Sequence, residues 1–362
     1  ELTERLDAKH ASEVCKQAVT LLTKHMSKTG NYVDLKELSL GLSHVTQQLE
    51  AINAAKLVLD QMRNTTASIA LPYLSKELSQ ITQRLNANDA SKVNEEAARM
   101  LIKQTSKRRP SIIELLMAVS NVTQRMKLDK ASPVCERAIK LSLPSLRRFI
   151  SHYYRRNLEL MATYSRLAQQ LNSNDALKVA NFVMEESNKE ATLQYAYFLH
   201  KVFVKVGQRL DSTDAAKLLT EQIGKAKYFP SDRIVEMFSP IARRLDADDA
   251  SKASKLLMKQ RNTTSSRSHR NISVGFSMVV QRLAPVDAVT LLMDEMNRTM
   301  NSVVLRGISE GLSKAVQRLD VKQASKVCKQ AVKKLTEQMS SDRESYYYEQ
   351  LSLGLSLVAQ QL

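Results

Sequence analysis

Hydrophobic residues recur along the whole chain at helical spacing, separated by short polar breaks. One apolar stripe begins at Ala324 and continues through Val327, Cys328, Ala331, Val332, Leu335 and Met339. A second stripe consists of Leu351, Leu355, Val358, Ala359 and Leu362. Positions three, four and seven apart share one face of an α-helix, so each stripe predicts an amphipathic helix. The pattern predicts two such helices in each of a series of similar segments.

A recurring phrase, close to Gln-Arg-Leu-Asp-x-x-Asp-Ala, joins the second helix of one segment to the first helix of the next. It occurs ten times, and its Leu or Met is residue 6, 49, 85, 126, 171, 210, 245, 283, 319 or 362. A period of about 40 residues is typical of helical repeats that stack into a solenoid. We therefore expect an all-α superhelix, an α-solenoid of about nine antiparallel helix pairs. Residues 1–362 are expected to form a single array, a segment of a longer one.

The polar residues of the phrase predict where each first helix begins. Aspartate or asparagine follows the final Leu and suits the N-cap, as at Asp211, Asp246 and Asp320. Pro285 falls at the expected first helical residue, where proline is tolerated. One segment departs from this pattern after Met126, and there the sequence predicts a helix start at Ser132-Pro133.

Three further residue types recur at fixed positions of the repeat, which we call columns, and each has a structural interpretation. Arginine before the final Leu or Met complements a helix dipole, and glycine eight residues before it indicates a close approach between helices. Glutamine two places before it either bonds a tight turn or binds the backbone of an extended peptide on a concave face. The glycines are Gly41, Gly275, Gly311 and Gly354; the glutamines are Gln47, Gln83, Gln124, Gln169, Gln208, Gln281, Gln317 and Gln360.

The two-helix unit resembles the HEAT/armadillo class of helical repeats. The stretch from Gly311 to Asp320 resembles tandem repeats of about 40 residues in large bacterial proteins, of the form Gly-Leu-x-x-Val-Ala-x-Arg-Leu-x-x-x-Asp-Ala. This resemblance covers essentially the whole chain. It implies a repeat architecture and no particular chemistry.

Cysteine usage and hydropathy bear on the cellular setting. Cys15, Cys135 and Cys328 occupy the same position of distant segments, so we expect buried free thiols in a reducing compartment. No stretch approaches the roughly 18 apolar residues of a membrane helix. We expect a cytoplasmic (intracellular) protein with no membrane span.

Positive charge is the main indication of a partner. The formal net charge is +17, from 54 Lys and Arg against 37 Asp and Glu, which suits an acidic protein or other acidic polymer, a nucleic acid or an anionic membrane surface. The basic residues gather in the turns from first to second helix, which vary in length. Our candidate binding residues are Lys107, Arg108, Arg109, Arg147, Arg148, His152, Tyr153, Tyr154, Arg155, Arg156, Arg267 and Arg270.

Signals for catalysis are weak. The six histidines are scattered, and no phosphate-binding glycine loop or paired metal-ligand motif occurs. Gly307-Ile308-Ser309-Glu310-Gly311 has the letters of a nucleophile elbow but falls within a predicted helix. We expect no catalytic residue, metal or cofactor. The leading hypothesis is a non-enzymatic scaffold for protein–protein interaction, and the alternative is sequence-tolerant nucleic-acid binding along the basic edge. A purely structural spacer without a ligand is a third possibility.

Overall fold

The structure is a computed structural model that describes residues 8–65, 68–107, 112–150, 154–189, 193–223, 231–261, 266–299 and 302–341, with 352 and 356. In these residues all regular secondary structure is helical, with 17 α-helices and the short 3-10 helices η2 (Ser68–Ala70) and η3 (Thr82–Arg84). The chain divides into two compact units. One comprises Glu1–Val179 with Thr192–Phe198, and the other Ala180–Ala191 with Leu199–Leu362.

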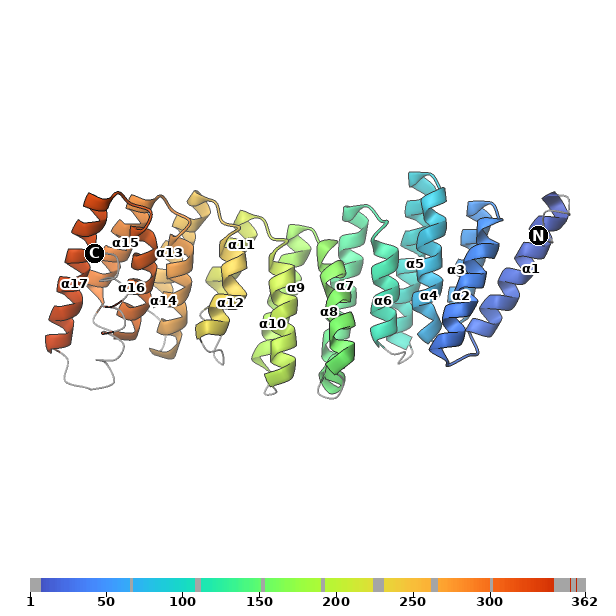
Figure 1. The fold of residues 1–362 in the computed structure, drawn as a ribbon, viewed down its shortest axis with the longest axis horizontal. Helices are drawn as coiled ribbons and strands as arrows, with labels where there is room; N and C mark the ends of the chain where they lie inside the picture. The colour runs from blue at the N-terminus through green and yellow to red at the C-terminus, as the bar shows by residue number, and fades with distance from the viewer. Residues whose placement is uncertain are drawn as a thin grey trace. The chain divides into compact units, whose positions relative to one another are not determined.

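The first unit contains eight helices and part of two more (Figure 1). They are α1 (Ala8–Met26), α2 (Tyr32–Gln47), α3 (Ala51–Asn64), α4 (Leu71–Ile81), α5 (Ala87–Lys107), α6 (Ile112–Thr123), α7 (Leu128–Ile150) and α8 (Tyr154–Gln169). The helices α9 (Ser173–Asn188) and α10 (Leu193–Gly207) contribute residues to both units. The second unit also contains α11 (Ser212–Gln222), α12 (Ser231–Ala242), α13 (Ala247–Arg261), α14 (Ser266–Val280), α15 (Pro285–Arg298), α16 (Ser302–Val316) and α17 (Val321–Ser341).

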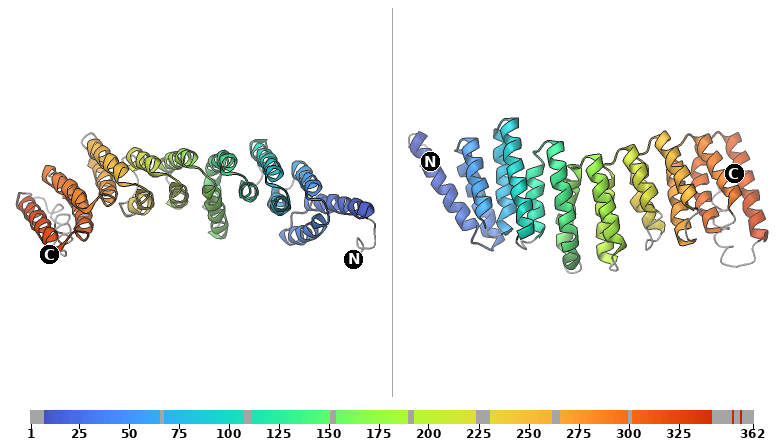
Figure 2. Two further views of the ribbon diagram at one scale, coloured as in Figure 1. Left: turned by 90° about the horizontal axis from the view of Figure 1, so that it is seen from above. Right: turned by 180° about the vertical axis from the view of Figure 1, so that it is seen from behind.

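Within each unit the helices pack as stacked pairs. In the first unit α1 contacts α2 and α3, while α2 contacts α4, α4 contacts α6, and α6 contacts α8. The second unit repeats this scheme with α11 to α17, so odd-numbered helices form one layer and even-numbered helices the other (Figure 2). This is the all-α solenoid that the sequence predicts. The described residues form eight helix pairs and α17, and residues 342–351 and 353–355, where the partner of α17 is expected, lie outside them.

The predicted helix starts are confirmed in most segments. The Asp211 carboxylate accepts the Asp214 amide at 2.8 Å, and Asp246 and Asp320 cap α13 and α17 in the same way. Pro285 is the first residue of α15. The prediction for the irregular segment was wrong, because α7 begins at Leu128 and Pro133 lies inside it.

The start of α7 has a physical explanation in its backbone. The Lys127 carbonyl accepts the amides of Lys130 and Ala131 at 3.0 and 2.8 Å, which closes the first turn without a side-chain cap. The Ser132 hydroxyl is used elsewhere. It accepts the Asn172 amide at 2.9 Å and donates to Asp175 at 2.7 Å, and so links the starts of α7 and α9.

The recurring arginine binds the preceding segment. Arg318 donates from Nη1 to the Gln281 carbonyl at 2.8 Å and from Nη2 to the Leu283 carbonyl at 2.7 Å. Arg84 makes a similar pair of bonds, to the Thr46 and Leu49 carbonyls. The cation therefore neutralises the C-terminal end of the previous second helix and ties two successive second helices together. We call this contact the arginine clamp; Arg244 and Arg282 form it with one bond each, to Leu210 and Leu245.

Glycine at the predicted position of close approach behaves differently from one segment to another. A Cβ atom on Gly311 would lie 2.9 Å from the Ser277 Cβ, and one on Gly275 would lie 2.1 Å from the Ile223 Cδ1. At Gly41 the nearest atom would be Leu22 Cδ2 at 3.7 Å, an ordinary contact. The prediction of a close approach is confirmed at Gly275 and Gly311 and wrong at Gly41; Gly354 lies outside the described residues.

The two glycines of the elbow-like motif serve helix packing. Both lie in α16, as predicted, and face α14: a Cβ on Gly307 would lie 3.3 Å from the Ser273 Cβ. The Ser277 hydroxyl donates to the Gly307 carbonyl at 2.6 Å. Small residues four apart let the backbones of α14 and α16 approach closely.

The cysteines are buried and free, as the sequence predicts. Burial raises the pKa of the Cys135 thiol to about 12, so this sulfur stays protonated and unreactive at neutral pH.

Candidate protein-binding groove

Eight of the candidate binding residues lie at helix ends beside the turns from first to second helix, and no candidate side chain is among those that the structure describes. Arg147 and Arg148 lie near the end of α7, and Tyr154, Arg155 and Arg156 lie in the first turn of α8. Lys107 ends α5, and Arg267 and Arg270 lie at the start of α14. Arg108, Arg109, His152 and Tyr153 lie outside the described residues, so this site stays a prediction.

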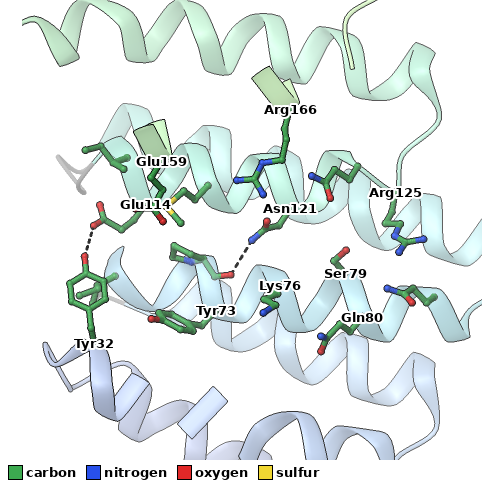
Figure 3. Close-up of a pocket in the computed structure, with 16 residues that line it drawn as sticks. Tyr32, Tyr73, Lys76, Ser79, Gln80, Glu114, Asn121, Arg125, Glu159 and Arg166 are labelled. Atoms are coloured by element: carbon green, nitrogen blue, oxygen red, sulfur yellow. Dashed lines mark hydrogen bonds between the residues drawn. The ribbon is translucent and has the colours of Figure 1, made fainter. Parts of the chain in front are cut away.

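A groove of about 750 Å³ lies on the second helices of the first unit (Figure 3). Its floor and walls come mainly from α4, α6 and α8, with Tyr32 contributed by α2. The lining is mixed, with apolar, amide and charged side chains. It consists of Tyr32, Ile69, Pro72, Tyr73, Lys76, Ser79, Gln80, Gln83, Ile113, Glu114, Met117, Asn121, Gln124, Arg125, Glu159 and Arg166.

Side-chain amides are spread over the length of the groove. Asn121 donates to the Pro72 carbonyl at 3.2 Å and to the Ser75 hydroxyl at 3.1 Å, and this joins α6 to α4. Gln80 accepts from Ser43 at 3.3 Å. Gln83 and Gln124 belong to the recurring glutamine column and line the groove, whereas Gln281 bonds the Ser277 carbonyl of its own helix at 3.0 Å. The column therefore contains glutamines that line the groove and one that bonds its own helix, and peptide binding by these amides stays a prediction.

The end of the groove near the starts of the second helices is acidic. The Glu114 side chain is only 6 % exposed, and its Oε1 accepts the Tyr32 hydroxyl at 3.0 Å. Its Oε2 is buried and has no hydrogen-bond partner among the described residues. A buried acceptor left in this way costs about 1–3 kcal/mol, and more for a charged group. Glu159 occupies the equivalent part of α8 and is exposed.

Basic side chains lie farther along the helices toward their C-terminal ends. Arg166 donates from Nη2 to the Thr163 hydroxyl at 3.3 Å, while its Nε is buried without a partner. Lys76 and Arg125 also line the groove and are exposed. Among the described residues, these cations form no ion pair with Glu114 or Glu159. The groove thus presents charges of both signs, and the Glu114 Oε2 and Arg166 Nε have no hydrogen-bond partner among the described residues.

A second buried carboxylate lies behind the groove and holds α2 to α4. Thr46 donates to Glu77 Oε1 at 2.5 Å, and Glu77 is only 3 % exposed. Burial raises the pKa of Glu77 above its ordinary value, and hydrogen bonds from Thr46 and Ser43 and the nearby Arg84 charge oppose that rise. This acid stabilises the junction and does not line the groove.

The sequence interpretation missed the groove because it followed basic residues and recurring columns. Glu114 carried a usable signal: it is an acidic residue between Ile113 and Leu115, within the apolar part of α6. An acid in such a run is buried at a cost and is often functional.

The described residues contain neither a cluster of metal ligands nor a membrane-spanning helix. No group of three or more His, Cys, Asp or Glu side chains lies close enough together to hold a metal ion there. Within the same ranges, no helix combines the length and the apolar character needed to cross a bilayer.

Comparison with known proteins bears on the fold alone. No family model matches the chain, and no curated protein matches it. Similar solved structures include an engineered protein at 10% identity, with a TM-score of 0.40 over 94% of this chain and 99% of that chain. Importin beta is similar at 11% identity and a TM-score of 0.42, over 99% of this chain and 49% of that chain.

A circular tandem repeat protein is similar at 15% identity and a TM-score of 0.22, over 98% of this chain and 85% of that chain. The chain spans about half the length of the importin beta chain. These TM-scores and identities carry no argument about partners. The helix pairs of the structure itself establish that the chain is a helical-repeat protein.

Proposed function

We propose that this chain is a non-enzymatic scaffold that binds a segment of another protein in the groove of α4, α6 and α8. The observation that carries the proposal is the groove itself, a hollow of about 750 Å³ with both apolar and hydrogen-bonding lining. An extended peptide needs partners for its backbone N–H and C=O groups. Amides such as Gln83 and Gln124 both donate and accept, and so satisfy either group.

The absence of catalytic function is part of the same proposal. The buried groups near the groove, Glu114 and Glu77, hold hydrogen bonds from Tyr32 and Thr46 and join neighbouring helices. The groove lining contains no cysteine or histidine. A basic edge at the turns between first and second helices would add attraction for an acidic partner.

Filling the groove should weaken binding strongly. A library of displayed random peptides is selected on the wild-type chain, and the most enriched peptide is synthesised and its Kd measured. Met117 is half-buried and lines the groove on α6, so Met117→Arg is expected to weaken binding at least tenfold by occupying the space. Leu141→Arg is the matched control, because Leu141 is exposed on α7 and does not line the groove. Equal binding by wild type and Met117→Arg would place the peptide elsewhere.

Nucleic-acid binding is the second candidate, and the helix ends favour it at one place. The last turn of α7 and the first turn of α8 carry Arg147, Arg148, Arg155 and Arg156 at one edge. If this edge binds phosphates, labelled single- and double-stranded DNA and RNA will bind in a strongly salt-dependent manner. Under our proposal the fluorescence anisotropy of these probes shows no salt-sensitive binding, and changing the four arginines to glutamate leaves it unchanged. Binding that falls steeply with salt and is lost in that variant would favour the second candidate.

A further inference from the structure

We infer that the groove recognises a peptide segment carrying one basic and one acidic side chain, held at opposite ends of the groove. This rests on the proposed function and names the partner chemistry that it leaves open. The basic side chain of the peptide binds Glu114 and Glu159, and the acidic side chain binds Arg166 and Arg125.

The acidic end has a built receptor for a cation. Glu114 is buried and fixed in place by the Tyr32 hydroxyl, yet its Oε2 has no donor. Glu159 stands on the neighbouring helix α8 and lines the same end (Figure 3). A lysine or arginine of the bound segment supplies the missing donor to Glu114 and pairs with Glu159, so binding removes the desolvation cost that the free protein carries.

At the basic end a buried hydrogen-bond donor lacks an acceptor. The Nε of Arg166 is buried without an acceptor, and its Nη2 makes a single bond of 3.3 Å to Thr163. A carboxylate approaching the guanidinium edge accepts from Nε and one Nη together, which is the geometry that arginine favours. Arg125 and Lys76 also line the groove and add positive potential.

The helix geometry sets the spacing between the two charges of the peptide. Glu159 and Arg166 are seven residues apart on α8, which corresponds to about 10 Å along the helix axis. An extended chain advances about 3.3 Å per residue, so the two peptide side chains lie about two to four residues apart.

Charge of both signs also selects between classes of partner. A nucleic acid offers only anionic groups along its backbone, and these would meet Glu114 and Glu159 in the groove. A protein segment carries both signs at chosen positions. The groove charges therefore favour a peptide over a nucleic acid at this site, whatever binds the basic edge.

The test compares the peptides selected by three forms of the full chain. Random eight-residue peptides on a display library are selected on wild type, on Glu114→Gln/Glu159→Gln and on Arg125→Gln/Arg166→Gln. Glu37→Gln/Lys92→Gln is the control, since both side chains are exposed and neither lines the groove. Circular dichroism and thermal unfolding confirm that each form is folded.

We expect wild type and the control to enrich peptides with Lys or Arg two to four residues from Asp or Glu. Peptides selected on Glu114→Gln/Glu159→Gln should lose the preference for a basic residue and keep the preference for an acidic one. Peptides selected on Arg125→Gln/Arg166→Gln should keep the basic preference and lose the acidic one. Each variant should bind the leading wild-type peptide at least tenfold more weakly. Enriched peptides without the charge pair, or preferences unchanged in the variants, would overturn the inference alone. No enriched peptide on wild type would overturn the proposed function with it.

Discussion

Replacing Phe203 by alanine is expected to lower the free energy of unfolding by about 3–5 kcal/mol, the usual cost of removing a buried aromatic ring. Phe203 lies on α10 and is 0 % exposed. Its ring meets that of Phe238 on α12 edge to face, with the centroids 5.2 Å apart and the planes at 67°. The substitution removes this contact and leaves a cavity between two successive second helices of the second unit.

The loss should be local, because each helix pair of a repeat array is stabilised only by its neighbours. Hydrogen exchange is expected to show protection lost first in α10 and α12, with a lowered midpoint of urea unfolding. Lys205→Ala is the control on the same helix, since Lys205 is exposed and should change stability by less than about 0.5 kcal/mol. A variant as stable as wild type would show that the Phe203–Phe238 contact is absent in solution.

Alanine at Gly311 and at Gly41 should change stability in opposite directions, although both glycines stand eight residues before the final Leu of their segments. Alanine is about 1 kcal/mol better than glycine in a helix interior. At Gly41 the new methyl group meets only Leu22 at 3.7 Å, so Gly41→Ala is expected to stabilise by up to about 1 kcal/mol.

At Gly311 the methyl group would meet the Ser277 hydroxyl oxygen at 2.8 Å and its Cβ at 2.9 Å. The serine cannot turn away freely, because its hydroxyl is bonded to the Gly307 carbonyl. Overpacking of this kind costs about 1–3 kcal/mol, which exceeds the gain in helix propensity. Thermal unfolding of Gly311→Ala should therefore show a lower midpoint than wild type, and that of Gly41→Ala a higher one. The same sign of shift in both variants would contradict the difference in packing.

The sequence was sufficient for the architecture because its signals are local. The apolar stripes define each helix, and the caps at Asp211, Asp246 and Asp320 depend only on residues three positions away. The start of α7 was predicted wrongly because the interactions that Ser132 makes are not local. Ser132 and Pro133 look like a cap, but the Ser132 hydroxyl is committed to Asn172 and Asp175, some forty residues away.

Local sequence patterns could not predict the groove, because it is formed by residues of three segments. Arg125 and Arg166 occupy unremarkable helical positions, and although Glu114 stands out within an apolar run, only the stacking of α4, α6 and α8 brings the three to one surface. Likewise the difference between Gly41 and Gly311 depends on the neighbour that each meets, Leu22 in one case and Ser277 in the other. A residue type that recurs at one repeat position predicts an equivalent position in the fold. It does not predict which side chains surround that position.

The arginine clamp has a consequence for how such a chain can change in evolution. Arg84 and Arg318 bind main-chain carbonyl groups of the preceding segment, which every amino acid provides. The junction therefore places no demand on the side chains of its neighbour. Whole segments can be duplicated, lost or exchanged while the bond between successive units is kept, which leaves the groove side chains free to diverge.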